Sequence, residues 1–291
     1  RIVKYKADGT WIKTIAYGSE SVTTATYTAE DEIEYIRLCK QNSNGMSVTI
    51  LKYSSPTPLI NADKNITKSI FASVSMFENV GFCGDSYTVG SLFNSQNAYL
   101  GDFPNISWGK VLARMTGITA NIYASGGANT ENWQTRSDCL PKLLADNPCN
   151  LYLLCLGIND YATMTLGTIA DIKEDYTQNP NTFYGNYGRI IAQIKAHAPN
   201  AKIAIVKCFR TYQNSSYYAY SSVAIEEIAS HFNIPYIETN DSILFHSEWY
   251  ANNMYGGHPT APQHSAIAKE MKSLIEKCID DNLEYFSNYS N

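Results

Sequence analysis

The feature that most constrains the fold is an alternation of short apolar runs and amphipathic stretches that begins near residue 78. The apolar runs, each bounded by turn residues, read VGFC, ANIYAS, NLYLLCLG, AKIAIVKC and IPYIET. The stretches between them have helical patterns, and a last helix is expected in SAIAKEMKSLIEKCIDDN. Continuous apolar strands that alternate with amphipathic helices are typical of a parallel sheet covered on both faces. We therefore predict an α/β fold, a three-layer α/β/α sandwich with a mostly parallel five-stranded sheet.

The first 57 residues have a different pattern, in which β-branched residues alternate and no helical period is visible. RIVKYKA and WIKTIAY flank DGT, which is a hairpin signal. The stretch SSPTPLI then reads as a linker, because its prolines cannot join a central ladder. We therefore predict a small all-β segment over residues 1–57, a partial β-sandwich, and an α/β domain over residues 58–291. A segment this small buries little surface by itself, so its remainder lies upstream or it docks on the second domain.

The charge and hydropathy patterns exclude two classes of partner. The chain has 22 basic and 27 acidic residues, a net charge of −5, and no Lys/Arg cluster, so nucleic-acid binding is not expected. No apolar run approaches the roughly 18 residues of a membrane span, and the first residues lack the apolar stretch of a signal peptide. Because the chain begins with Arg rather than Met, we expect a processed form or an excised fragment of something longer.

The cysteine and histidine patterns give no sign of a metal or a cofactor. The seven cysteines include no C-x-x-C pair, and no spacing such as H-E-x-x-H occurs. We therefore expect neither a metal site nor a cofactor site. Cys139 and Cys149 could pair, although nothing in the sequence requires it.

Small or polar residues stand where the predicted strands end. Ser86 follows the first strand in GFCGDSYTVG, and Gly126 and Gly127 follow ANIYAS. Asn159 follows NLYLLCLG in GIND, and His258 precedes the last helix in GGHPTAPQHSAIA. Because the carboxyl ends of parallel strands face the same edge of a sheet, residues far apart in the sequence can meet there.

These residue types suit acyl transfer. A serine hydroxyl is a poor nucleophile until a base takes its proton, and histidine is the usual base. The tetrahedral intermediate carries an oxyanion that needs fixed donors, which the Ser86 N–H, a glycine N–H and the Asn159 amide can supply. Taken alone, Ser86 could be only a turn residue or a helix N-cap, and Asn159 only an Asx turn. It is the occurrence of all the positions in order that favours a catalytic interpretation.

The order of GDS, then glycine, then GxND, then a late HP before a terminal helix is similar to the SGNH (GDSL-type) hydrolase family. The matching blocks span residues 79 to 270. The resemblance implies an SGNH/flavodoxin-like fold, with Ser86 as the nucleophile and His258 as the base. It also implies Ser86, Gly127 and Asn159 as oxyanion donors. Gly127 is preferred to Gly126, because the family's glycine usually precedes a small residue and then a hydroxyl or amide residue.

The chain departs from the family pattern at two positions. Tyr255 stands where the family has an Asp, three residues before the histidine, and Gln263 stands where a Gly is often found. The second change is expected only to alter a helix start. The first removes the usual acid beside His258, so another group must hold the ring. We expect a backbone carbonyl of the Met254–Gly257 loop and hence a Ser–His dyad; the alternative is one of the nearest acids, Glu238, Asp241 and Glu248.

Three further residues near these motifs have simpler interpretations. Asp85 and Asp160 are expected to fix local turns through bonds from the backbone to their side chains rather than to act on substrate. His264 is the one rival to His258, but it falls one turn into the following helix.

The sequence therefore predicts a carboxylic ester hydrolase that removes a small acyl group, acetyl above all, from a carbohydrate. Two alternatives stay open: an SGNH scaffold that binds a glycan with little or no turnover, and a lipase or lysophospholipase of the same family. No long apolar lid segment is visible, which weighs against long acyl chains. The β segment resembles those that precede such domains in phage tail and bacterial surface proteins. This resemblance implies a place in a larger surface or tail assembly, outside the cell or on a virion.

Overall fold

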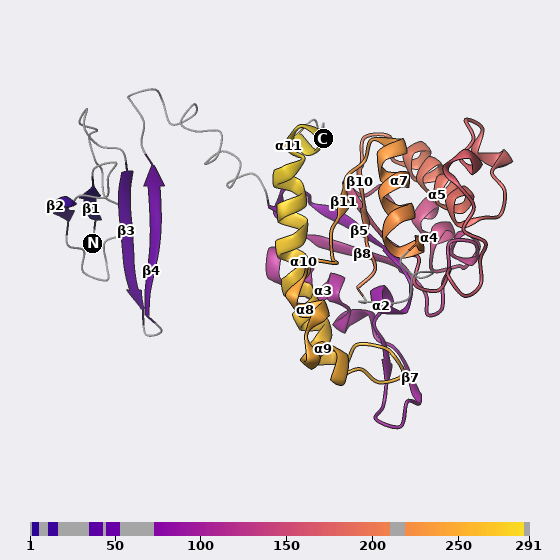
Figure 1. Ribbon diagram of the computed structural model, residues 1–291, viewed down its shortest axis with the longest axis horizontal. Coiled ribbons are helices and arrows are strands. Elements are labelled where there is room, and N and C mark those ends of the chain that lie inside the picture. The colour runs from indigo at the N-terminus through magenta and orange to yellow at the C-terminus, as the bar shows by residue number, and fades with distance from the viewer. Residues whose placement is uncertain are drawn as a thin grey trace. The chain divides into compact units, whose positions relative to one another are not determined.

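The structure, a computed structural model, describes the backbone of residues 2–5, 11–16, 35–42 and 45–52. Both backbone and side chains are described for residues 73–209 and 219–287. The chain divides into two units, Arg1–Phe71 and Ala72–Asn291, each of which is described by itself (Figure 1). The predicted boundary between residues 57 and 58 lies outside the described residues.

The first unit contains a four-stranded antiparallel sheet in the order β2-β1-β3-β4. Its strands are β1 (Ile2–Tyr5), β2 (Trp11–Ala16), β3 (Tyr35–Asn42) and β4 (Gly45–Lys52). The hairpin predicted around DGT corresponds to the β1–β2 pair. The described strands agree with the small β-rich segment predicted ahead of the α/β domain, while its bounds and its assignment as a partial β-sandwich stay predictions.

The second unit is built on a five-stranded sheet in the order β11-β10-β9-β5-β8, and every neighbouring pair is parallel. The strands are β5 (Asn79–Gly84), β8 (Thr119–Ala124), β9 (Leu151–Cys155), β10 (Lys202–Val206) and β11 (Tyr236–Ile237). Each strand falls on one of the five apolar runs, so the predicted parallel sheet is confirmed.

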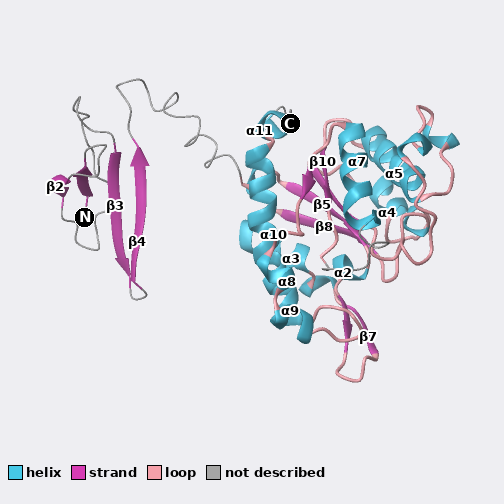
Figure 2. Cartoon of the chain, viewed as in Figure 1, coloured by secondary structure: helices cyan, strands magenta, loops and turns pink. Residues whose placement is uncertain are grey.

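Helices cover both faces of this sheet, which makes three layers (Figure 2). Helices α3 (Trp108–Thr116) and α10 (Ala261–Asp281) pack on one face. The other face is covered by α4 (Leu140–Ala145), α5 (Phe183–His197) and α7 (Ala224–Phe232).

Strand β9 shows why the strands read as unbroken apolar runs. Leu151 and Leu153 point into the core beneath α3 and α10, whereas Tyr152 and Leu154 point into the core on the other face. All four are at most 1% exposed. Alternate side chains of a strand lie on opposite faces, so a strand covered on both sides has no position for a polar residue.

Short elements complete the second unit. The helices are α2 (Ser86–Val89), α8 (Ile243–His246), α9 (Glu248–Asn252) and α11 (Leu283–Ser287). Single turns occur at Val74–Met76, Pro104–Ile106, Asn132–Gln134, Ile169–Asp171 and Tyr176–Gln178, with a π-helical turn at Ala219–Val223. An antiparallel hairpin of β6 (Ser91–Phe93) and β7 (Tyr99–Asp102) projects from the α/β core (Figure 1).

Two expectations about individual residues can be judged from the fold. Gln263 belongs to a capping box with Thr260, in which the Gln263 side chain accepts a 2.9 Å hydrogen bond from the Thr260 N–H. The change from the family's Gly is therefore accommodated at a helix start, as expected.

Cys139 and Cys149, which could have paired, are both free thiols buried in the core.

Candidate active site

Ser86 lies at the turn between strand β5 and helix α2, at the carboxyl edge of the sheet. The preceding Asp85 is the N-cap of α2, and its Oδ1 accepts a 2.9 Å hydrogen bond from the Tyr87 N–H. Gly84 permits the sharp turn, because a Cβ there would lie 2.2 Å from the Thr88 hydroxyl oxygen. The short GDS sequence thus places the Ser86 hydroxyl at the end of a buried strand, with the side-chain cap holding the turn.

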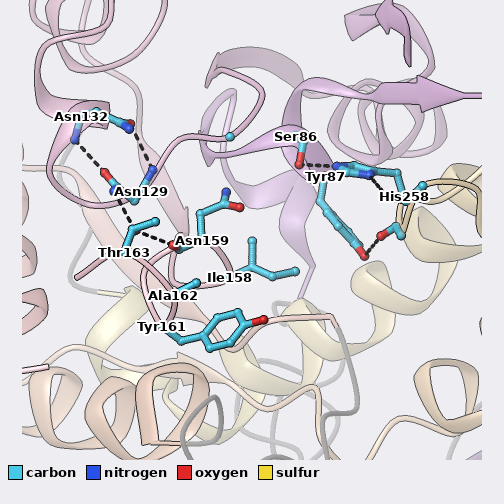
Figure 3. Close-up of a pocket in the computed structure, with 13 residues that line it drawn as sticks. Ser86, Tyr87, Asn129, Asn132, Ile158, Asn159, Tyr161, Ala162, Thr163 and His258 are labelled. Atoms are coloured by element: carbon cyan, nitrogen blue, oxygen red, sulfur yellow. Dashed lines mark hydrogen bonds between the residues drawn. The ribbon is translucent and has the colours of Figure 1, made fainter. Parts of the chain in front are cut away.

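The structure brings His258 onto Ser86 although 172 positions separate them (Figure 3). The His258 Nε2 atom is 2.9 Å from the Ser86 Oγ atom. The other ring nitrogen, Nδ1, is 2.7 Å from the carbonyl oxygen of Gly256. Because a carbonyl can only accept, this contact assigns the ring proton to Nδ1 and leaves the lone pair of Nε2 facing the serine hydroxyl. This is the tautomer that a general base needs.

The loop before His258 is a tight two-residue turn. The backbone of Tyr255 and His258 exchanges two hydrogen bonds, of 3.1 and 2.9 Å, and the intervening glycines have φ values of +55° and +72°. Positive φ at both central residues is the mark of a type I′ turn, which two glycines adopt without strain. The turn directs the Gly256 carbonyl to the His258 ring, so the expected contact from a carbonyl of the Met254–Gly257 loop is confirmed.

The acids that were the alternative partners lie in other surroundings. Glu238 bonds the buried Lys207 ammonium at 2.5 Å and accepts from the Asn240 N–H at 2.8 Å. Asp241 and Glu248 are exposed. Tyr255, at the family's Asp position, is 37% exposed and contributes its backbone to the turn.

Residues that the sequence analysis did not single out hold the histidine turn in place. The Phe93 ring stacks on the His258 ring, with 4.4 Å between centroids and 22° between planes. Asn97, at the tip of the β6–β7 hairpin, accepts a 2.6 Å hydrogen bond from the Gly256 N–H. The Tyr87 hydroxyl donates to the Gly257 carbonyl at 2.7 Å. The run SLFNSQNAYLG, with turn residues between two short apolar pieces, was the available sign of this hairpin.

The predicted oxyanion donors also lie at this edge. Ser86, Gly127, Asn159 and His258 all line one cleft of about 350 Å³. Gly127 belongs to a turn closed by a 3.1 Å hydrogen bond from the Ala128 N–H to the Ser125 carbonyl. The Asn159 side-chain amide donates to the Ala128 carbonyl at 2.9 Å, which ties it to the same turn. Of the two candidate glycines, Gly127 is the one that lines the cleft.

The rest of the cleft has a polar and an apolar side (Figure 3). Asn129 and Asn132 bond each other's backbone N–H groups at 2.9 and 3.1 Å, and the Asn129 amide donates to the Thr163 hydroxyl at 3.1 Å. Ile158 and Ala162 line the same space. A cleft of this volume with a few fixed polar groups is of the size that small ligands occupy.

Two buried carboxyl groups lie behind the site and serve the turns, as predicted for them. Asp85 caps α2, and Asp160 accepts bonds from the Thr130 N–H at 2.9 Å and the Thr130 hydroxyl at 2.5 Å. Burial raises the pKa of Asp85 to about 7 and that of Asp160 to about 6, because it disfavours the charged form.

The rival histidine, His264, is fully buried in α10. Burial, and to a lesser extent the charge of His258, lowers its pKa to about 4. Within residues 73–209 and 219–287, its ring nitrogens have no hydrogen-bond partner. The imidazole that meets Ser86 is that of His258.

The described residues contain neither a metal-binding cluster nor a membrane-spanning helix. No group of three or more His, Cys, Asp or Glu side chains among them is placed to hold a metal ion. In the same part of the chain, no helix has the length and apolar character needed to cross a bilayer.

A parallel α/β/α sandwich with a strand-end serine paired to a histidine just before the long helix α10 is the arrangement of an SGNH-type acylhydrolase. The chain belongs to the GDSL-like lipase/acylhydrolase family, whose profile matches residues 82–266. No curated protein matches the chain.

Two solved structures show the same fold. One is an active-site mutant of a family two carbohydrate esterase from Clostridium thermocellum, with 14% identity and a TM-score of 0.51 over 82% of this chain and 68% of that one. The other is described as a GDSL-like lipase from Bacteroides ovatus, with 17% identity and a TM-score of 0.51 over 69% of this chain and 98% of that one. At these identities the likeness concerns the fold alone.

Proposed function

We propose that this acylhydrolase is a serine esterase that removes small acyl groups, acetyl above all, from a carbohydrate. The observation that carries the proposal is the geometry of one pair. The Ser86 hydroxyl is 2.9 Å from His258 Nε2, while Nδ1 of the same ring is held at 2.7 Å by the Gly256 carbonyl. A serine within hydrogen-bond reach of an oriented base is the requirement for nucleophilic catalysis.

In the proposed reaction, Ser86 Oγ attacks the carbonyl carbon of the ester as its proton passes to His258 Nε2. The developing oxyanion faces the N–H groups of Ser86 and Gly127 and the amide of Asn159. The imidazolium then gives its proton to the leaving alkoxide, and water, activated by the same nitrogen, hydrolyses the acyl-enzyme. A carbonyl orients the ring but carries no full charge, so the imidazolium is stabilised less than by a carboxylate. We therefore expect a modest kcat.

The size and lining of the cleft suit an ester of a small acyl group with a polar alcohol. The cleft is about 350 Å³, and Asn129, Asn132 and Thr163 present amide and hydroxyl groups that can bond sugar hydroxyls. A carbohydrate esterase is among the proteins of the same fold, which makes an acetylated glycan a reasonable first substrate.

The test compares p-nitrophenyl acetate with p-nitrophenyl octanoate, and then acetate release from acetylated oligosaccharides. We expect acetate to be the better ester, and Ser86→Ala to lower kcat on the order of 10⁶-fold. Ser137→Ala, at an exposed serine, is the matched control and should keep the wild-type rate. Equal rates for wild type and Ser86→Ala would refute the esterase proposal and favour the alternative of a glycan-binding module. A preference for octanoate would favour the alternative of a lipase.

A further inference from the structure

Arg136 lies outside the sequence blocks that carry the candidate site, yet its guanidinium contacts the turn that carries Gly127. Its Nη1 donates to the Gly126 carbonyl at 2.6 Å and to the Ser125 hydroxyl at 3.0 Å. Its Nη2 is 3.4 Å from the Gly127 carbonyl. All three contacts are to one short turn at the edge of the cleft.

The segment that carries Arg136 is anchored in the core. The neighbouring Trp133 is fully buried, and its indole N–H donates to the Tyr123 carbonyl of strand β8 at 2.9 Å. The Arg136 N–H donates to the Asn132 carbonyl at 3.0 Å. The guanidinium is therefore presented from a fixed base rather than from a free loop.

The turn itself could exist in two forms. The Ala128 N–H bonds the Ser125 carbonyl, and φ is positive at Gly127 (+70°) but not at Gly126, so the turn is of type II. A type I turn differs mainly by a flip of the central peptide, and a Gly-Gly pair tolerates both forms. The space beside Gly127 is open, because an added Cβ there would meet no atom within 4 Å.

The central peptide joins the Gly126 carbonyl to the Gly127 N–H. In a planar trans peptide these two groups point in opposite directions. When Arg136 holds the Gly126 carbonyl on one side, the Gly127 N–H must therefore point to the other. The flipped turn would break the 2.6 Å charge-assisted bond to Arg136 and turn the N–H around.

We propose that Arg136 is a positioning residue for the oxyanion hole: it locks the 126–127 peptide so that the Gly127 N–H faces the reacting carbonyl. The positive charge on the carbonyl side also polarises the amide and strengthens its N–H as a donor. This inference rests on the proposed esterase function, in which the Gly127 N–H stabilises the transition state. Losing one oxyanion donor typically costs ~10²–10³ in kcat, which sets the scale of the expected effect.

The experiment uses Arg136→Ala and Arg136→Lys, with Arg114→Ala as the matched control. Arg114 also donates to a backbone carbonyl, that of Asn105 at 2.9 Å, but is not part of the cleft. With p-nitrophenyl acetate, we expect Arg136→Ala to lower kcat about 10²-fold with KM within about threefold, because the lost interaction acts in the transition state. The kcat of Arg136→Lys should lie between those of the wild type and Arg136→Ala, since lysine keeps the charge but not the fork of donors. Added ethylguanidinium should restore part of the rate of Arg136→Ala and leave the control unchanged.

A crystal structure of Arg136→Ala provides a readout that does not depend on turnover. We expect the 126–127 peptide to be flipped or to occupy both orientations. Retention of the wild-type turn, or a kcat within threefold of the wild type in a folded variant, would overturn the inference. An inactive wild type would instead refute the esterase proposal, and the orientation of the peptide would still decide whether Arg136 positions it. If Arg136→Ala does not fold, Arg136→Lys serves for both measurements.

Discussion

Replacing Gly256 by alanine tests how the histidine is held. Gly256 has φ of +55°, and an added Cβ would lie 2.5 Å from Phe93 Cδ1 and 2.8 Å from Phe93 Cγ. The Phe93 ring is the one that stacks on His258, and the Gly256 carbonyl is the one that bonds His258 Nδ1. The substitution therefore disturbs these two contacts of the imidazole without touching Ser86.

The size of the effect follows from two costs. A non-glycine residue in the left-handed region costs about 1–2 kcal/mol. A hydrogen bond such as that to Nδ1 contributes about 0.5–1.5 kcal/mol. If the turn relieves its strain by moving away from the ring, about 1.5–3.5 kcal/mol is lost from the oriented state. Since about 1.4 kcal/mol corresponds to a tenfold change in rate, kcat for p-nitrophenyl acetate should fall roughly 10- to 300-fold.

Gly117→Ala is the control, because it imposes the same backbone strain without a clash. Gly117 has φ of +81° at the end of α3, and an added Cβ would meet no atom within 4 Å. Its melting temperature should fall by about 2–4 °C per kcal/mol of strain, with kcat unchanged. If Gly256→Ala keeps kcat within twofold of the wild type and melts no lower than Gly117→Ala, the Gly256 carbonyl does not orient His258 and this account of the dyad is wrong.

Two further predictions concern acidic residues. Because a carbonyl holds the His258 ring, kcat should stay within about tenfold of the wild type in each of three variants, Glu238→Gln, Asp241→Asn and Glu248→Gln. A fall of ~10⁴ in one of them, as when a triad Asp becomes Asn, would show that this acid orients His258. Burial raises the pKa of Asp85 from 3.8 to about 7, so between these pH values the folded state holds a proton that the unfolded state lacks, and stability falls as pH rises. Asp85→Asn keeps an acceptor for the Tyr87 N–H but has no carboxyl group to titrate. From pH 4 to pH 8, the free energy of unfolding of this variant in urea should therefore rise relative to that of the wild type, by on the order of 4 kcal/mol. Parallel pH dependences of the two proteins would contradict this.

The parallel sheet could be predicted because burial on both faces leaves an unmistakable pattern. Residues such as Leu151 and Leu154 must be apolar whichever way they point, so the strands appear as unbroken apolar runs. Strand direction then predicts which edge of the sheet the residues after each strand reach. This is why the sequence alone predicts that Ser86, Gly127 and Asn159 lie together.

The parts that could not be predicted depend on local backbone geometry and on short elements. The β6 and β7 strands have three and four residues, too few for a period to show, yet their hairpin supplies Phe93 and Asn97 to the histidine turn. The choice between a carbonyl and an acid beside His258 depended on the φ values of two glycines. The contacts of Arg136 depend on how the segment after Trp133 is anchored, which no sequence pattern reports.

The central claim is that Ser86 is a nucleophile activated by His258, and covalent labelling tests it most directly. A fluorophosphonate reacts when a serine Oγ attacks phosphorus and fluoride leaves, so the adduct marks the activated residue. Intact-protein mass spectrometry followed by peptide mapping should find one adduct on Ser86 in the wild type, none in Ser86→Ala, and much slower labelling in His258→Ala. An unlabelled wild type, an adduct on another residue, or equal labelling of Ser86→Ala would contradict the account.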